Sequence, residues 1–277
     1  MSVNIEIKQK GLFKKKITVP EIAELENLSY GIADGSYRLV PGEVGQYTIL
    51  YNLDCIGRGI EVSIENDNVN LRLNLPTIPK EIKLFYRLTE RICEKLKLKE
   101  FYRDEEKVNI KDAGVFYEPD KAACERALSD ITHKIKTQDT KEFYIFGAMN
   151  PIALGIKEVE TINGSLEAFE KFLTELQQRD IYYAVPRFYK QQDESVLGVY
   201  YVGENVVSAF PYQPKLPFIQ IQDVANWYAM LPENNILKYE DFIHHVEKQD
   251  DYDASRFVIQ LSKEKIEELV SAYKTEL

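Results

Sequence analysis

Residues 47–79 read YTILYNLDCIGRGIEVSIENDNVNLRLNLPTIP. Apolar residues recur at every second position in three segments of this stretch, which is the period of a β-strand with one buried face. The polar run 66–68 separates the second segment from the third and is suited to a hairpin turn. The pattern therefore predicts a three-stranded antiparallel meander, with strands at 47–51, 60–64 and 69–75.

A helical pattern follows the meander. Pro76 and Pro79 end the strand pattern, and apolar residues then recur at spacings of three or four as far as Leu96. This spacing predicts an amphipathic helix that packs on the sheet, and a similar stripe predicts a second helix from about residue 119 to 136. Grouped strands, with helices apart from them, indicate an α+β fold with mainly antiparallel sheets.

Short similarities at a nearly constant offset suggest an internal duplication. Residues 67–69, 76–79 and 136–137 resemble residues 204–206, 214–217 and 274–275, at offsets of 137 or 138. We therefore predict two pseudo-repeated halves, residues 1–138 and 139–277, each with the element order β-α-β-β-β-α-α and helices packed on its sheet. Within the second half, apolar spacing predicts helices after Ser165, at 224–231, at 239–247 and at 266–273.

The two predicted halves differ in charge and in aromatic content. Residues 1–138 hold 22 basic and 22 acidic residues, whereas residues 139–277 hold 13 and 23, together with 21 of the 32 aromatic residues. An acidic surface disfavours nucleic acid and anionic membranes and favours a basic protein partner. Because neither a signal peptide nor a membrane-spanning run is apparent, we expect a cytoplasmic protein.

Motifs for catalysis and metal binding are missing from the sequence. The histidines are His133, His244 and His245, and no second helix supplies a matching set of metal ligands. Neither type of glycine-rich nucleotide loop is present, and no nucleophile motif is found. The three cysteines lack a C-x-x-C spacing, and two of them lie on or beside apolar helix stripes, where thiols are inert. We therefore expect no cofactor and no metal, and favour a binding protein over an enzyme.

The tyrosines of the second half are the first candidate site. Tyr182-Tyr183 and Tyr200-Tyr201 are predicted to lie on adjacent strands, so one tyrosine of each pair points away from the helix-covered face. That aromatic face either packs against the first half or lines a groove for a protein partner. Under the second interpretation the binding residues are Tyr183, Arg187, Tyr189 and Tyr201, in a role such as that of an immunity protein.

Two loops form the alternative site. The glycines of Gly57-Arg58-Gly59 would let backbone N–H groups and the guanidinium converge on a phosphate or carboxylate, unless the segment is an ordinary turn. Asn150 is placed to cap a single helical turn that begins at Pro151 and could receive an anion, or the segment is a plain connector. Together these loops would suit an enzyme or small-ligand-binding protein with a pocket between the two halves.

Several short segments resemble one uncharacterised bacterial family, known only as a domain of unknown function. They are 56–60 (IGRGI), 75–77 (LPT), 85–86 (FY) and 146–151 (FGAMNP). The resemblance covers nearly the whole chain and implies a bacterial cytoplasmic protein. It implies no activity, cofactor or catalytic residue.

Overall fold

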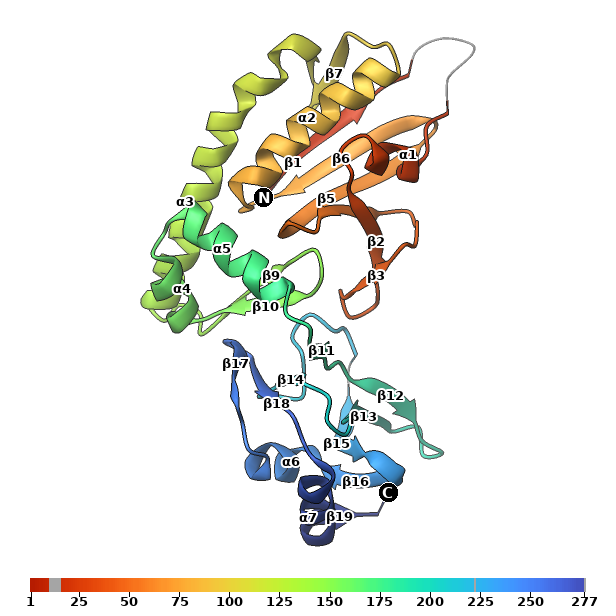
Figure 1. Cartoon of the computed structure of the whole chain (residues 1–277), viewed down its shortest axis with the longest axis vertical. Coiled ribbons are helices and arrows are strands. Elements are labelled where there is room, and N and C mark those ends of the chain that lie inside the picture. Colours follow the sequence, from red (N-terminus) through yellow and green to blue (C-terminus); the bar gives the residue numbers. More distant parts are fainter. Residues whose placement is uncertain (10–15, 222, 277) are drawn as a thin grey trace. The chain divides into compact units, whose positions relative to one another are not determined.

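The computed structural model describes residues 1–9, 16–221 and 223–276, which form two compact units, Met1–Gln178 and Arg179–Leu277 (Figure 1). The predicted boundary at residues 138 and 139 falls inside the first unit. The chain well beyond this boundary still packs on the first sheet, because Gln177 donates hydrogen bonds to the backbone carbonyls of Ile56 and Gly57.

The first unit contains an eight-stranded antiparallel sheet in the order β3-β2-β4-β5-β6-β1-β7-β8. The predicted meander is confirmed as β4, β5 and β6, which pair in sequence order. A separate hairpin joins β9 to β10. The strands are β1 (Ser2–Ile7), β2 (Ser29–Ala33), β3 (Leu39–Pro41), β4 (Thr48–Asn52), β5 (Cys55–Glu65), β6 (Asn68–Asn74), β7 (Glu100–Arg103), β8 (Glu106–Asn109), β9 (Phe143–Phe146) and β10 (Pro151–Leu154).

Helices cover one face of this sheet (Figure 1). Ile82, Phe85 and Ile92 on α2 are fully buried, as are the inward-facing Ile60 and Leu73 of the sheet, so the helix stripe and the strand alternation share one core. The helices are α1 (Val19–Glu24), α2 (Pro79–Lys95), η1 (Ile110–Phe116), α3 (Tyr117–Lys136), α4 (Ile156–Ile162) and α5 (Leu166–Gln177). The two predicted helices that follow the meander, one reaching Leu96 and one over about 119–136, are confirmed as α2 and α3.

The second unit contains two sheets, in the orders β11-β14-β18-β17 and β12-β13-β15-β16-β19. Most pairs are antiparallel, but β11 pairs with β14, and β13 with β15, in parallel. A cluster of rings fills the core, including Tyr200, Phe210, Tyr239 and Phe242. The elements are β11 (Tyr182–Tyr183), β12 (Arg187–Lys190), β13 (Val196–Tyr201), β14 (Ser208–Pro211), β15 (Val224–Leu231), η2 (Pro232–Asn234), β16 (Asn235–Lys238), α6 (Tyr239–His245), β17 (Asp250–Asp253), β18 (Arg256–Ile259), α7 (Lys263–Tyr273) and β19 (Lys274–Thr275).

Two predicted helical segments are strands. Residues 224–231 form β15, which lies between β13 and β16, because a segment rich in aromatic and branched residues pairs readily when two strands flank it. Pro151 begins β10 instead of a helical turn, because residues 151–154 pair with β9. The second unit thus has two sheets with parallel pairs, whereas the first has one antiparallel sheet and a hairpin. The predicted duplication is not confirmed.

No helix among the described residues combines the length and the apolar composition needed to cross a bilayer.

Candidate functional site

Three of the four predicted binding residues come together on the second unit. The Arg187 guanidinium lies 4.9 Å from the centre of the Tyr201 ring, and the Tyr189 and Tyr201 hydroxyl oxygens are 2.5 Å apart. Arg187 and Tyr189 are exposed on β12, which is the edge strand of its sheet, and Tyr201 is partly exposed at the end of β13. The hydrogen bond between the two hydroxyls raises the pKa of Tyr201. We call Arg187, Tyr189 and Tyr201 the β12 cluster.

Tyr183 does not belong to the β12 cluster, contrary to the sequence prediction. It lies on β11, in the other sheet of the unit, and only 5% of its surface is exposed. Its ring lies 3.8 Å from the guanidinium carbon of Arg256, a fully buried arginine. The outward-facing member of the pair is Tyr182, which is close enough to the cluster to raise the pKa of Tyr201. Each pair therefore alternates as predicted, but the exposed member of the first pair is Tyr182, and the two pairs lie in different sheets instead of on adjacent strands.

An aromatic pair lies on the face of the sheet opposite the β12 cluster. Phe188 of β12 and Trp227 of β15 lie on either side of Gly198, and their ring centres are 6.0 Å apart with an edge-to-face tilt of 75°. A Cβ atom at Gly198 would lie 2.3 Å from the indole of Trp227. The glycine is therefore required for the two rings to meet across the strand between them.

The segment Gly57-Arg58-Gly59 gathers backbone N–H groups as predicted, but the acceptor is part of the chain. Glu81, in the first turn of α2, accepts hydrogen bonds from the backbone N–H of Gly57, Arg58 and Gly59 at 3.1, 2.9 and 2.7 Å, and from the Thr77 hydroxyl. Burial raises the pKa of the Glu81 carboxyl, against the lowering effect of these donors. The side chain of Glu81 thus occupies the place expected for an external anion.

A bulge in β5 turns Arg58 toward the uncovered face of the sheet. Leu50 pairs with Ile60, yet two residues further along β4 the partner of Asn52 is Cys55, so β5 carries extra residues there. Gly59 has φ +75°, which a glycine adopts without strain. Arg58 consequently lies beside the outward-facing Glu61, in a pocket that both residues line.

The loop 147–150 closes against this bulge from behind. The Ala148 N–H donates to the Gly57 carbonyl at 3.0 Å, and the Met149 N–H donates to the Gln177 side-chain oxygen at 2.9 Å. Asn150 contributes its backbone carbonyl, which accepts from Gly147 in the turn of the β9–β10 hairpin. The structure therefore brings the two predicted loops together, although Asn150 caps no helix.

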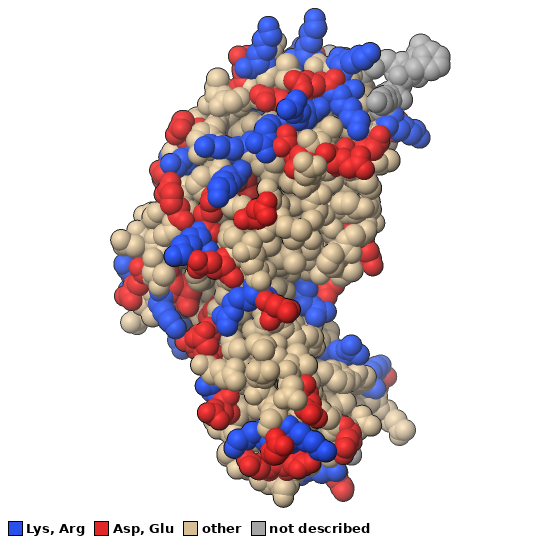
Figure 2. Space-filling model, viewed as in Figure 1, with Lys and Arg blue, Asp and Glu red and all other residues tan. Residues whose placement is uncertain are grey.

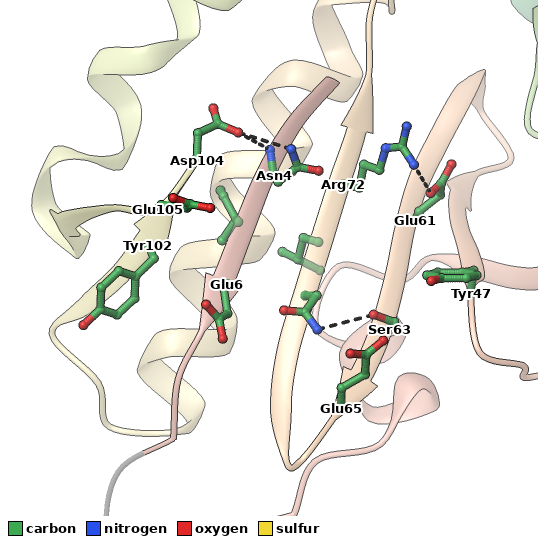
Figure 3. A pocket seen from close by; sticks show the side chains of 13 residues that line it. Asn4, Glu6, Tyr47, Glu61, Ser63, Glu65, Arg72, Tyr102, Asp104 and Glu105 are labelled. Carbon is green, nitrogen blue, oxygen red and sulfur yellow. Dashed lines mark hydrogen bonds and ion pairs between the residues drawn. The ribbon is translucent and has the colours of Figure 1, made fainter. Parts of the chain in front are cut away.

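Two pockets lie on the uncovered face of the first sheet. One, of about 820 Å³, is lined mainly by polar and acidic side chains of β1, β5, β6 and β7. Several of these side chains are hydrogen-bonded to one another: Asn4 donates to Asp104, and Asn70 donates to Ser63 (Figure 3). The second, of about 520 Å³, shares Tyr47, Glu61 and Arg72 with the first and adds Arg58, Tyr37 and Phe146. Acidic and basic side chains are interspersed over the visible face of each unit (Figure 2).

Sequence reasoning missed Glu81 and the aromatic side chains of the second pocket. Glu81 is 22 to 24 residues from the amides that it binds, so no local motif announces the contact. The alternating pattern predicts Tyr47 on the buried face of its strand, but Thr48 and Leu50 face the core, which leaves Tyr47 57% exposed. The one sequence signal for Glu81 was its place in the first turn of a predicted helix, where a carboxylate is favoured and can accept hydrogen bonds from backbone N–H groups.

The cysteine thiols are poor nucleophiles. All three are buried and free, and burial raises the pKa of Cys93 to about 12 and that of Cys124 to about 11. Burial also raises the pKa of Cys55. Across residues 1–9, 16–221 and 223–276, no three His, Cys, Asp or Glu side chains gather closely enough to hold a metal ion.

Comparison with protein families matches residues 2–269 to a domain of unknown function, DUF4299. The chain belongs to this family. The match spans both compact units and agrees with the resemblance of the short segments at 56–60 and 146–151. Neither a curated protein nor a solved structure matches the chain.

Proposed function

We propose that this DUF4299 protein is a non-catalytic binding module that recognises a basic protein partner through the β12 cluster. The observation that carries the proposal is the exposure of Arg187 and Tyr189 on an edge strand, in contact with Tyr201. Tyrosine and arginine dominate the binding energy of many protein interfaces, because they offer large rigid surfaces with polar tips.

The position of β12 favours a protein partner over a small molecule. Among the described strands, β12 pairs only with β13, so its outer edge presents backbone groups to an added strand. Val185 and Pro186 precede β12 and are buried, whereas Tyr189 is 42% exposed. An extended partner segment laid along this edge would contact Arg187 and Tyr189 with its side chains.

Charge favours a basic partner. The second unit, Arg179–Leu277, holds 10 basic and 16 acidic residues. The turn between β12 and β13 carries exposed Asp193 and Glu194. Glu194 lies 3.3 Å from Lys190 of β12, whereas Asp193 accepts hydrogen bonds from Ser195 that lower its pKa. The Asp193 carboxylate therefore lies at one end of the proposed contact strand, where it would attract lysine and arginine side chains.

Affinity purification with the whole chain as bait, followed by titration of the recovered partner, tests the proposal. Tyr189→Ala and Tyr201→Ala are each expected to weaken binding at least about tenfold, as the loss of a central aromatic contact does. The matched control is Tyr117→Ala, a partly exposed tyrosine at the start of α3 in the first unit. Full affinity in both cluster variants, with their folding intact, would contradict the proposal.

A further inference from the structure

The pocket of about 520 Å³ in the first unit holds an arginine whose hydrogen bonds are only partly satisfied by the protein. The Arg58 Nε donates to the Phe146 carbonyl at 3.1 Å, and Nη1 donates to the Leu75 and Pro76 carbonyls at 3.2 and 3.5 Å. No described residue accepts a hydrogen bond from Nη2. Carbonyls therefore hold the guanidinium in place and leave one of its nitrogens for a ligand.

Arg58 also forms no ion pair with any described carboxylate. Burial lowers its pKa to about 10, despite the opposing effects of the Glu81 and Glu61 charges, so the side chain is still charged at neutral pH. Glu61 is already engaged, because it accepts a hydrogen bond from Asn74 at 2.6 Å and lies 3.7 Å from Arg72. Figure 3 shows Arg72 and Glu61 turned toward each other. A partly buried cation without a paired anion is a feature of anion-binding sites.

The walls of the pocket are aromatic. The rings of Tyr37 and Phe146 are 4.5 Å apart, and Tyr47 lines the pocket with 57% of its surface exposed. Ile32 and Ile49 add apolar surface. A flat ring would fit such walls, since aromatic surfaces stack on one another and on guanidinium planes.

The available donors favour a carboxylate over a phosphate. The backbone N–H groups of residues 57–59, which could otherwise surround phosphate oxygens, are already occupied by Glu81. Arg72 is shared with Glu61, so Arg58 is the cation of the pocket without a paired carboxylate among the described residues. One guanidinium nitrogen matches a singly charged group better than a doubly charged one.

We propose that this pocket binds a small aromatic carboxylate, with the carboxylate on Arg58 Nη2 and the ring against Tyr37, Tyr47 and Phe146. The site is independent of the β12 cluster, because every lining residue belongs to Met1–Gln178. The bulge at Gly59 places Arg58 in the pocket, and Glu81 holds the bulge.

Titration of the whole chain with 2-naphthoate, followed by calorimetry or by protein NMR shifts, tests this proposal. The neutral isostere 2-naphthamide is the matched probe, and we expect it to bind at least tenfold more weakly. Inorganic phosphate is expected to compete poorly. Equal binding of naphthoate and naphthamide, or no naphthoate binding up to 10 mM, would overturn the proposal.

Variants separate the contributions of the charge and the walls. Arg58→Lys keeps a positive charge but loses the fork of nitrogens, and should weaken naphthoate binding about tenfold. Tyr47→Ala, at an exposed position, should weaken binding severalfold without lowering the melting temperature. Arg126→Gln, an exposed arginine of α3 outside the pocket, is the control and should bind as wild type does. Unchanged affinity in a folded Tyr47→Ala or Arg58→Lys protein would refute the assignment.

Discussion

Glu81 satisfies three consecutive backbone N–H groups of β5, and Gly57 leaves the space for it to do so. A Cβ atom at Gly57 would lie 2.5 to 2.8 Å from the carboxyl atoms of Glu81. We expect Gly57→Ala to lower the free energy of unfolding by about 2–3 kcal/mol, because overpacking would push this carboxyl off its donors. Urea denaturation gives the measurement. Gly35→Ala, where no atom lies within 4 Å of the added Cβ, should cost far less; equal losses would contradict this account.

Tyr183 stabilises a charge that is buried completely. Arg256 has no exposed surface, its Nη1 donates to the Ala184 and Ala209 carbonyls, and its Nε and Nη2 have no hydrogen-bond partner among the described residues. The Tyr183 ring is therefore a main source of compensation for the guanidinium. We expect Tyr183→Leu to cost about 2 kcal/mol in thermal or urea unfolding. The neighbouring exposed residue provides the control, since Tyr182→Leu should cost little.

The thiols provide a test of burial by chemical labelling. Because burial raises the pKa of Cys93 to about 12 and of Cys124 to about 11, almost no thiolate is present at pH 8 in the folded chain. We expect iodoacetamide to leave both residues unmodified until the protein is unfolded. Mass spectrometry of digested protein identifies the labelled sites. Rapid modification of either thiol in the native chain would show that its surroundings open readily.

At the scale of elements, β12 is an edge strand among the described strands and carries the proposed partner contact. If the partner is basic, the sign of a new charge on β12 matters: Tyr189→Lys should weaken binding more than Tyr189→Glu, although both remove the ring. Surface plasmon resonance at two salt concentrations would measure the difference, which should shrink at high salt. The reverse order of affinities would indicate an acidic partner.

Elements with a single consistent pattern were predictable from sequence. The strand β6 alternates strictly between buried and more exposed positions, short turns join β4 to β6, and α2 follows two prolines with an apolar stripe, so local pattern and tertiary packing agree. The prediction of a helix at 224–231 was wrong because Val224, Trp227, Tyr228 and Leu231 also fit helical spacing. Only pairing with β13 and β16 decides between helix and strand there. The glycines around Arg58 were recognised, but their acceptor lies on another element.

At the scale of the whole chain, the compact units do not follow the proposed repeat. Placing the boundary after Gln178 returns α5 to the first unit, where Thr174 and Gln177 contact the backbone of Ile56. Local similarities at a constant offset gave no information on these long-range contacts. The two observed units differ less in net charge than the two predicted halves do, because the first unit holds 25 basic and 29 acidic residues and is itself acidic.

The boundary is testable by truncation. We expect residues 1–178 to fold cooperatively on their own, whereas residues 1–138 should lose the helix that binds the β5 carbonyls and be less stable or unfolded. Circular dichroism during thermal unfolding distinguishes the two. A fragment 1–138 as stable as 1–178 would instead support the boundary that the sequence predicts, between residues 138 and 139.

Gln177 is the last residue but one of the first unit, and its amide clamps two strand carbonyls while accepting the Met149 N–H. The end of the first unit is therefore fixed to the β5 backbone next to Arg58. Gln178 is fixed as well, because its side chain donates to the Leu53 carbonyl at 2.8 Å. A shift of the β5 backbone at residues 56 and 57 would therefore disturb the last helical turn of this unit as well as the position of Arg58.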